Sequence, residues 1–167
     1  AMWMLGSSLF GAQLAARMGL PYAFAAHFAP DHLDAALALY RREFQPSPAL
    51  QQPHVMVAMT VICAETDAEA ELLASSQAQS FVRLRTGQPG RLPPPVADYR
   101  QSLPAPAQAM LAHLGQASAI GALGTVREAM ARFIARTGAD EIIVSGSTFD
   151  PDARIRSLEL TMAALAG

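Results

Sequence analysis

Two neighbouring hydroxyl side chains, Ser7 and Ser8, follow Gly6 directly after a short apolar run. The apolar run predicts a strand and the residues after Ser8 predict a helix, so these three residues occupy a strand-to-helix junction. A glycine there permits a tight turn and close backbone approach, and the free amides of a first helical turn attract an anion. The junction therefore suits a phosphate group, although an ordinary serine N-cap explains the same residues.

The junction does not match the common nucleotide-binding motifs. It has neither the Gly-Lys-Ser/Thr of a P-loop nor the Gly-x-Gly-x-x-Gly of a dinucleotide-binding fold. Gly11 follows three residues after Ser8, where a small residue lets the helix approach the sheet or a ligand. The motif alone thus leaves both a phosphate site and an ordinary N-cap open, and it identifies no particular phosphate-containing ligand.

His27 and Phe28 directly follow a second predicted strand, at the end where parallel α/β folds place their sites. A histidine beside an aromatic ring there can line a pocket or transfer a proton, and a loop histidine without a catalytic role is the alternative. His27 is the one candidate catalytic residue, and the catalytic set is otherwise unknown.

Other chemistry-bearing residues form no recognisable set. The four histidines do not combine with carboxylates at metal-ligand spacing, so no metal site is expected. No nucleophile elbow or catalytic carboxylate pair stands out. Asp140 and Glu141 precede the last predicted strand, which favours a structural role. Residues 146–150 follow that strand on the functional face, and a simple loop that ends in the Asp150 N-cap is the alternative.

Four predicted strands alternate with helices along the chain, at residues 2–5, 20–26, 54–64 and 141–145. Helices are predicted over 9–18 with Gly19 as the stop, from Asp31 to Phe44, from Thr66 to Arg85, from Thr125 to Gly138, and from Asp150 onward. The last helix carries a predicted core stripe that consists of Ile155, Leu158, Met162 and Leu165.

Repeated strand-helix units with short connections predict an α/β fold with a parallel sheet. A proline-rich loop excursion at 86–106, followed by a short helix near 106–114, interrupts the alternation without separating two domains, so one domain over 1–167 is expected. Four units suit either a small open sheet or half of a (β/α)8 barrel, and length does not decide between them.

Composition excludes several classes of protein. The chain has 167 residues, is 51% hydrophobic and carries a net charge of −2, so it lacks the basic surface of a nucleic-acid-binding protein. No apolar run approaches the ~20 residues of a membrane span, and no leader is recognisable. The single Cys63 predicts a buried thiol and a cytoplasmic location. An apolar strand at the very start suggests the downstream part of a longer protein.

Several segments together resemble the bacterial luciferase-like flavin-dependent monooxygenases, and most closely their uncharacterised single-component branch. The resemblance covers nearly the whole chain and is carried by residues 3–8, 15–16, 19–30, 138–144 and 149–157. It implies a TIM (β/α)8 barrel that uses reduced FMN, supplied by a separate flavin reductase, with oxygen and a small organic substrate. A deazaflavin is a less favoured cofactor, and a homodimer or higher self-association is expected.

The resemblance also implies roles for particular residues. Gly6, Ser7 and Ser8 match the turn that holds the flavin phosphate, and His27 and Phe28 match positions near the flavin ring. Only the carboxyl-terminal half of the barrel is matched, without the strands that supply the catalytic histidine or cysteine. We therefore expect weak FMN binding and no activity from this chain alone.

Two alternatives remain at this stage. The first is a non-catalytic assembly module, because a half-barrel leaves open strand edges and an apolar face that invite a second copy. The second is an open-sheet protein that binds a phosphate-containing ligand and is unrelated to the luciferases.

Overall fold

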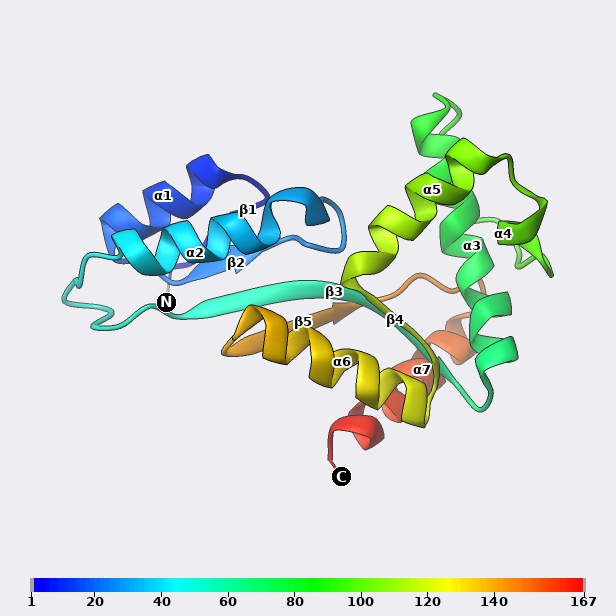
Figure 1. Ribbon diagram of the computed structural model, residues 1–167. Helices are drawn as coiled ribbons and strands as arrows, with labels where there is room; N and C mark the ends of the chain where they lie inside the picture. The colour runs from blue at the N-terminus through cyan, green and yellow to red at the C-terminus, as the bar shows by residue number, and fades with distance from the viewer. Residues whose placement is uncertain (1, 167) are drawn as a thin grey trace. The chain divides into compact units, whose positions relative to one another are not determined.

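The computed structural model describes residues 2–166, which alternate between strands and helices along the chain (Figure 1). Neighbouring strands β1–β2, β2–β3 and β3–β4 pair in parallel, and β5 also pairs with β3. The predicted α/β class with parallel strands is confirmed. The elements are β1 (Met4–Gly6), α1 (Leu9–Met18), β2 (Tyr22–Phe24), η1 (Pro30–His32), α2 (Leu33–Glu43), β3 (Val55–Ala64), α3 (Asp67–Arg85), α4 (Tyr99–Ser102), α5 (Ala105–Leu114), η2 (Gly115–Ala117), β4 (Ser118–Ala122), α6 (Leu123–Thr137), β5 (Glu141–Ser145) and α7 (Pro151–Leu165).

The chain forms two compact units, and the boundaries between them fall within β3, α6 and β5. The first unit contains Ala1–Met59 and Arg132–Val144, and the second contains Thr60–Ala131 and Ser145–Gly167. Strands β1 and β2 lie in the first unit, β4 lies in the second, and β3 and β5 cross from one unit to the other. The phosphate-site residues predicted from the sequence lie in the first unit.

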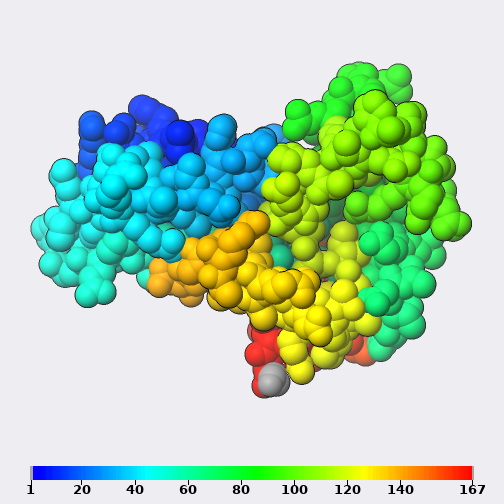
Figure 2. Space-filling view, viewed as in Figure 1, coloured from blue at the N-terminus to red at the C-terminus, as the bar shows by residue number. Residues whose placement is uncertain are grey.

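The core of the first unit lies between its strands and the helices α1 and α2. Register pairs Met4 with Tyr22 and Tyr22 with Val55, so these side chains share one face of the sheet. Tyr22 is fully buried there, and its ring lies 5.4 Å from that of Tyr40 on α2. Figure 2 shows α1 and α2, in blue to cyan, as a continuous surface on this side of the unit. Leu5 belongs to the opposite face and is 71% exposed.

Polar contacts fasten the start of β3 to the start of β5. The amide of Val55 donates to Asp140 Oδ2 at 2.8 Å, and the amide of Asp140 donates to the Val55 carbonyl at 2.9 Å. His54 Nε2 lies 2.6 Å from Glu141 Oε1. The structural role predicted for these two acids is confirmed.

The second unit has a small apolar cluster of its own. Ala78, Leu111 and Leu114 are buried together, so α5 packs on α3 beside the proline-rich segment. Thr66 caps α3 as predicted, because its hydroxyl accepts from the Glu69 amide at 3.2 Å. Glu69, however, accepts from the amide of Glu65 rather than from that of Thr66, so the predicted capping box is only half formed.

Two helix starts differ from the prediction, and one strand and one short helix are additional to it. Asp31 lies inside the 3-10 helix η1, so α2 begins at Leu33 instead of behind an Asp31 cap. Thr125 lies inside α6, because that helix begins at Leu123 directly after β4. The sequence analysis also missed β4 and the short α4, since the small residues of β4 resemble a loop.

The largest correction concerns α7. The predicted core stripe is exposed, and the buried face of the helix instead consists of Ser157, Leu160, Thr161 and Ala164. The helix start is confirmed, because Asp150 Oδ1 accepts from the Asp152 amide at 2.9 Å and Pro151 occupies the first turn. Within residues 2–166, no helix is both long and apolar enough to cross a membrane.

Candidate functional site

The N-terminus of α1 opens directly beyond β1 and leaves amides available. Ser8 is the N-cap in an extended conformation, and its Oγ accepts from the Gly11 amide at 3.4 Å. The amides of Leu9 and Phe10 have no hydrogen-bond acceptor within the described part of the chain. Free amides at a helix start, together with the positive end of the helix dipole, favour an anion at this position.

Gly6 and Gly11 bring the strand and the helix close together. A Cβ atom on Gly6 would lie 3.6 Å from the Gly11 Cα and 3.6 Å from the Tyr22 hydroxyl. Gly6 ends β1, and it is not among the described glycines with positive φ. These are ordinary van der Waals distances, so neither the space beside Gly6 nor the tight turn that we expected requires a glycine at this position.

Tyr22 supports the junction from below, which the sequence analysis did not foresee. Its hydroxyl donates to the Ser8 carbonyl at 3.2 Å, and burial raises the pKa of Tyr22 to about 12. The phenol thus stays protonated and remains a donor at neutral pH. The sequence gives no signal that Tyr22, the first residue of β2, bonds to the Ser8 carbonyl, because buried aromatic residues are common in strands.

His27 lies at the carboxyl end of β2, near the end of β1. The Gly6 carbonyl accepts from the Ala25 amide at 3.0 Å, and the His27 amide donates to the Ala58 carbonyl at 3.1 Å. The ring atom Nδ1 of His27 is buried without a hydrogen-bond partner, and burial lowers the pKa of this histidine. A neutral imidazole with an unused nitrogen is therefore held beside the junction.

The structure places the two predicted segments at the same edge of the sheet. Gly6 pairs in register with Phe24, and Ser7 and His27 follow these two strand ends. Among the hydrogen bonds and ring contacts of residues 2–166, none joins the side chains of Ser7 or Ser8 to those of His27 or Phe28. Phe28 is 53% exposed, so its ring is open to contact with a ligand.

The segment after β5 belongs to the second unit and is held by α3. Gln77 accepts from the Ser147 amide at 2.9 Å and donates to Thr60 Oγ1 at 3.3 Å. The hydroxyl of buried Thr148 donates to the Asp150 carbonyl at 3.0 Å. The loop ends in the predicted Asp150 N-cap, and a functional role for its other residues stays a prediction.

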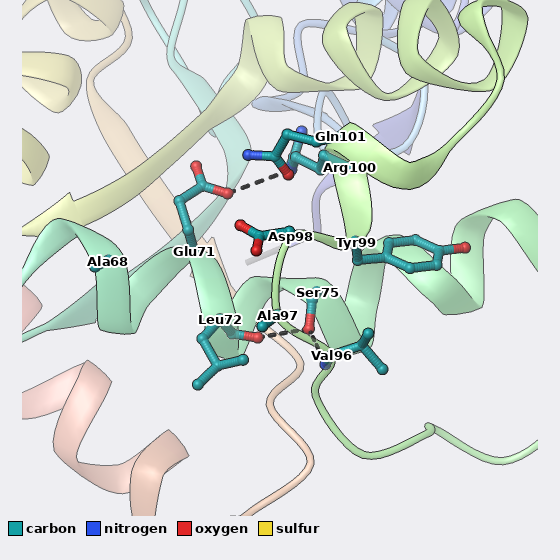
Figure 3. Close-up of a pocket in the computed structure, with 10 residues that line it drawn as sticks. All are labelled: Ala68, Glu71, Leu72, Ser75, Val96, Ala97, Asp98, Tyr99, Arg100 and Gln101. Atoms are coloured by element: carbon teal, nitrogen blue, oxygen red, sulfur yellow. Dashed lines mark hydrogen bonds and ion pairs between the residues drawn. The ribbon is translucent and has the colours of Figure 1, made fainter.

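A cavity of about 430 Å³ lies in the second unit between α3 and the residues that lead into α4 (Figure 3). An ion pair spans part of its wall, with Arg100 Nε 3.4 Å from Glu71 Oε2. Ser75 accepts from the Val96 amide at 2.8 Å and donates to the Leu72 carbonyl. None of the predicted site residues lines this cavity.

The remaining titratable groups form no metal centre. No group of three or more histidines, cysteines or acids in residues 2–166 is arranged to hold a metal ion. Cys63 is free and buried, as predicted, and burial raises the pKa of its thiol. The junction after β1, with His27 beside it, is the candidate site with the clearest ligand chemistry.

Comparison with known proteins gives a consistent family. A family model described as luciferase-like monooxygenase matches residues 2–141. A luciferase-like monooxygenase of Escherichia coli (strain K12) is 46% identical over 160 residues, which cover 96% of this chain and 48% of the relative. The uncharacterized protein YvbT of Bacillus subtilis (strain 168) is 42% identical over 95% of this chain and 47% of its own length. The chain thus spans about half the length of these relatives.

Solved structures agree in fold. The crystal structure of apo-MsnO8 matches 99% of this chain and 51% of its own with a TM-score of 0.88 and 31% identity. The oxygenating constituent of 3,6-diketocamphane monooxygenase of Pseudomonas putida, solved with FMN, matches 95% of this chain and 46% of its own with a TM-score of 0.61 and 21% identity. With the family model, the relatives and the fold in agreement, the chain belongs to the luciferase-like monooxygenase family.

Proposed function

We propose that this chain provides the flavin-phosphate-binding part of a flavin-dependent monooxygenase. Gly6, Ser7 and Ser8 would hold the phosphate, and His27 and Phe28 would lie beside the flavin ring. The observation that carries the proposal is the pair of unpartnered amides at the start of α1, which opens at the carboxyl end of β1.

The residues present fit this group. The hydroxyls of Ser7 and Ser8 can donate to phosphate oxygens, and the amides of Leu9 and Phe10 add two further donors without side-chain rearrangement. Buried Nδ1 of His27 has no partner within residues 2–166, and a polar atom of a bound ring would satisfy it. Reduced FMN, when bound, would supply the electrons with which oxygen is activated.

The further requirements of such an enzyme are part of the same proposal. A separate flavin reductase would deliver reduced FMN in the cytoplasm, and a small organic molecule would be the substrate. Because the chain spans about half the length of its relatives, we expect one wall of the flavin site from it. The isolated chain should therefore bind FMN weakly and show no monooxygenase activity.

A second candidate function is self-assembly into a homodimer without chemistry. It is favoured by one observation, the exposed apolar side chains of the first unit: Leu5 is 71% exposed and Ile143 is 51% exposed. Strand β1 pairs only with β2 among the described residues, so its other edge can accept a strand. Light scattering that finds a monomer at micromolar concentration would exclude this function.

Two N-cap variants test the phosphate site against a matched control. Ser8→Ala and Thr66→Ala each remove a hydroxyl that caps a helix, so each should lower the free energy of unfolding by about 1 kcal/mol. Only Ser8→Ala should also weaken FMN binding, by roughly tenfold, since a charge-assisted hydrogen bond contributes about 1.5–3 kcal/mol. Equal FMN affinities of the two variants would contradict the proposed site.

A further inference from the structure

We propose that Tyr22 is a positioning residue for the phosphate contact, because its hydroxyl aims and polarises the amide of Leu9 through the Ser8 carbonyl. That carbonyl and the Leu9 amide belong to one planar, trans peptide unit. The C=O and N–H bonds of such a unit point in opposite directions, so a contact that fixes the carbonyl also fixes the amide. The proposal rests on the proposed function, in which the Leu9 amide is one of two backbone donors to the flavin phosphate.

The Ser8 carbonyl accepts two hydrogen bonds within the first unit. The Ala12 amide donates to it at 3.3 Å, which is the first bond of α1, and the Tyr22 hydroxyl donates to it at 3.2 Å. Both lone pairs of this oxygen are thus used by the protein. The Leu9 amide, at the other side of the same peptide unit, has no acceptor within residues 2–166 and is left for a ligand.

The Tyr22 side chain is held so that its hydroxyl stays on this carbonyl. Its ring is fully buried, 5.4 Å from the ring of Tyr40 and 6.1 Å from that of Phe24. Its backbone pairs with Met4 on one side and with Val55 on the other, so it lies between two neighbouring strands. Burial raises the pKa of Tyr22 to about 12, so the hydroxyl keeps its proton and donates at neutral pH.

A hydrogen bond to the carbonyl makes the amide of the same peptide unit a stronger donor. The Tyr22 hydroxyl withdraws electron density from the peptide, and hydrogen bonds linked in a chain strengthen one another by about 10–30% per bond. The gain is realised only when an anion lies at the Leu9 amide, so it applies to FMN and not to riboflavin, which lacks the phosphate. Buried Tyr22 therefore favours the phosphorylated flavin through Leu9, without being exposed to the ligand.

Tyr22→Phe and Tyr40→Phe test this assignment as a matched pair. Each removes a hydroxyl that is bonded to a backbone carbonyl and keeps the buried ring, yet only the Tyr22 hydroxyl is bonded to Ser8. Calorimetry measures the Kd of FMN and of riboflavin for both variants and for the unsubstituted chain. We expect Tyr22→Phe to raise the Kd of FMN about threefold and to leave that of riboflavin unchanged. Tyr40→Phe should lower the Tm more and should leave both Kd values unchanged.

Amide NMR of the ligand-free chain gives a second readout that does not depend on FMN. A hydrogen bond at a carbonyl deshields the amide nitrogen of the same peptide unit, because it withdraws electron density from that nitrogen. Tyr22→Phe should therefore shift the Leu9 nitrogen resonance upfield, and Tyr40→Phe should leave it in place. A loss of stability alone would not produce this difference between the two variants.

Two results would overturn the proposal. One is a Leu9 nitrogen resonance that Tyr22→Phe does not move. The other is a ratio of the FMN and riboflavin Kd values that Tyr22→Phe does not alter, or that Tyr40→Phe alters equally. Failure of the proposed function looks different, because the unsubstituted chain would then bind FMN no better than riboflavin. In that case the Leu9 resonance alone decides whether Tyr22 acts on this amide.

Discussion

At Gly121 both the backbone conformation and the surrounding atoms oppose a side chain. Its φ is +154°, and a Cβ atom there would lie 2.5 Å from Asp67 Oδ1 and 2.7 Å from the Thr125 Cβ. The neighbouring amide of Ala122 donates to Asp67 Oδ1 at 2.7 Å, so the close approach is what lets α3 bond to the end of β4. The glycine is thus required by both conformation and space.

Gly121→Ala should lower the free energy of unfolding by about 2–4 kcal/mol, the range expected for a strained and overpacked position. Gly124 is the matched control, because it lies in the first turn of α6 with no atom within 4 Å of an added Cβ. Gly124→Ala should leave stability unchanged or raise it by up to about 1 kcal/mol. Urea unfolding measures both, and equal effects would show that the contact with Asp67 is not tight.

Asp67 should make stability depend on pH. The Ala122 amide and the Thr125 hydroxyl hold the pKa of this exposed carboxyl below its ordinary 3.8. Its contribution is therefore present above the unfolded-state pKa and is lost as the pH falls through the lower folded-state pKa. The Asp67→Asn variant should therefore have a lower free energy of unfolding than the unsubstituted protein at neutral pH. This difference should shrink as the pH falls below about 4.

Asp152→Asn is the control for that measurement, because the Asp152 carboxyl accepts no hydrogen bond from the residues in 2–166. The urea midpoints of both variants are followed from pH 7 to pH 3. A constant deficit for Asp67→Asn over this range would mean that the charge of Asp67 does not stabilise the fold.

One hydroxyl group connects helix α2 with the segments that precede β2 and β3. Tyr40 is fully buried, and its hydroxyl donates to the Leu20 carbonyl at 2.9 Å. The same oxygen accepts from the His54 amide at 3.2 Å and lies 3.3 Å from the His54 carbonyl. The single side chain thus connects α2 with the residues that precede β2 and β3.

Tyr40→Phe should destabilise the protein more than Tyr22→Phe. Loss of the Tyr40 hydroxyl removes the partner of two partly buried backbone groups, the Leu20 carbonyl and the His54 amide, at a cost of about 1–3 kcal/mol. Within residues 2–166 the Tyr22 hydroxyl makes one hydrogen bond, to the Ser8 carbonyl, so the loss of this hydroxyl should cost about 0.5–1.5 kcal/mol. Thermal unfolding compares the Tm values of the two variants. A lower Tm for Tyr22→Phe would show that the hydrogen bond to the Ser8 carbonyl contributes more to stability.

Sequence patterns predicted elements well where local chemistry determines them. The apolar run of β3 and the Asp150-Pro151 start of α7 are both found as predicted. Gly19 ends α1 in the left-handed conformation, with its amide bonded to the Ala16 carbonyl. The short strand β4 was missed, since its register with β3 is a tertiary contact that no local pattern records.

The pattern of α7 shows a further limit. Four large apolar residues at helical spacing predict a buried stripe, yet periodicity does not say what buries it. In this chain Ser157 faces the unit, where its hydroxyl accepts from the Cys63 amide. Thr161 is buried too, with its hydroxyl bonded to the Ser157 carbonyl of the same helix, and the apolar side stays open. For the site, the Gly6 to Ser8 junction and His27 were predictable from position, whereas Tyr22 beneath Ser8 was not.

At the scale of the whole molecule, the chain is 51% hydrophobic and about half as long as its relatives. Its exposed large apolar residues include Leu5 in the first unit and Met162 in the second. A composition this apolar fits a chain that offers apolar surface to other parts of a larger fold. The central claim nevertheless concerns the junction after β1, because it determines what the protein binds.

Calorimetric titration of the intact chain with FMN and with riboflavin tests that claim most directly. The two ligands share the flavin ring and differ in the phosphate, so their difference in affinity isolates the proposed contact. We predict weak binding of FMN, with a Kd that is about tenfold or more below that of riboflavin, as expected for a phosphate held by charge-assisted hydrogen bonds. Equal affinities for FMN and riboflavin, or no binding of FMN at all, would contradict the account.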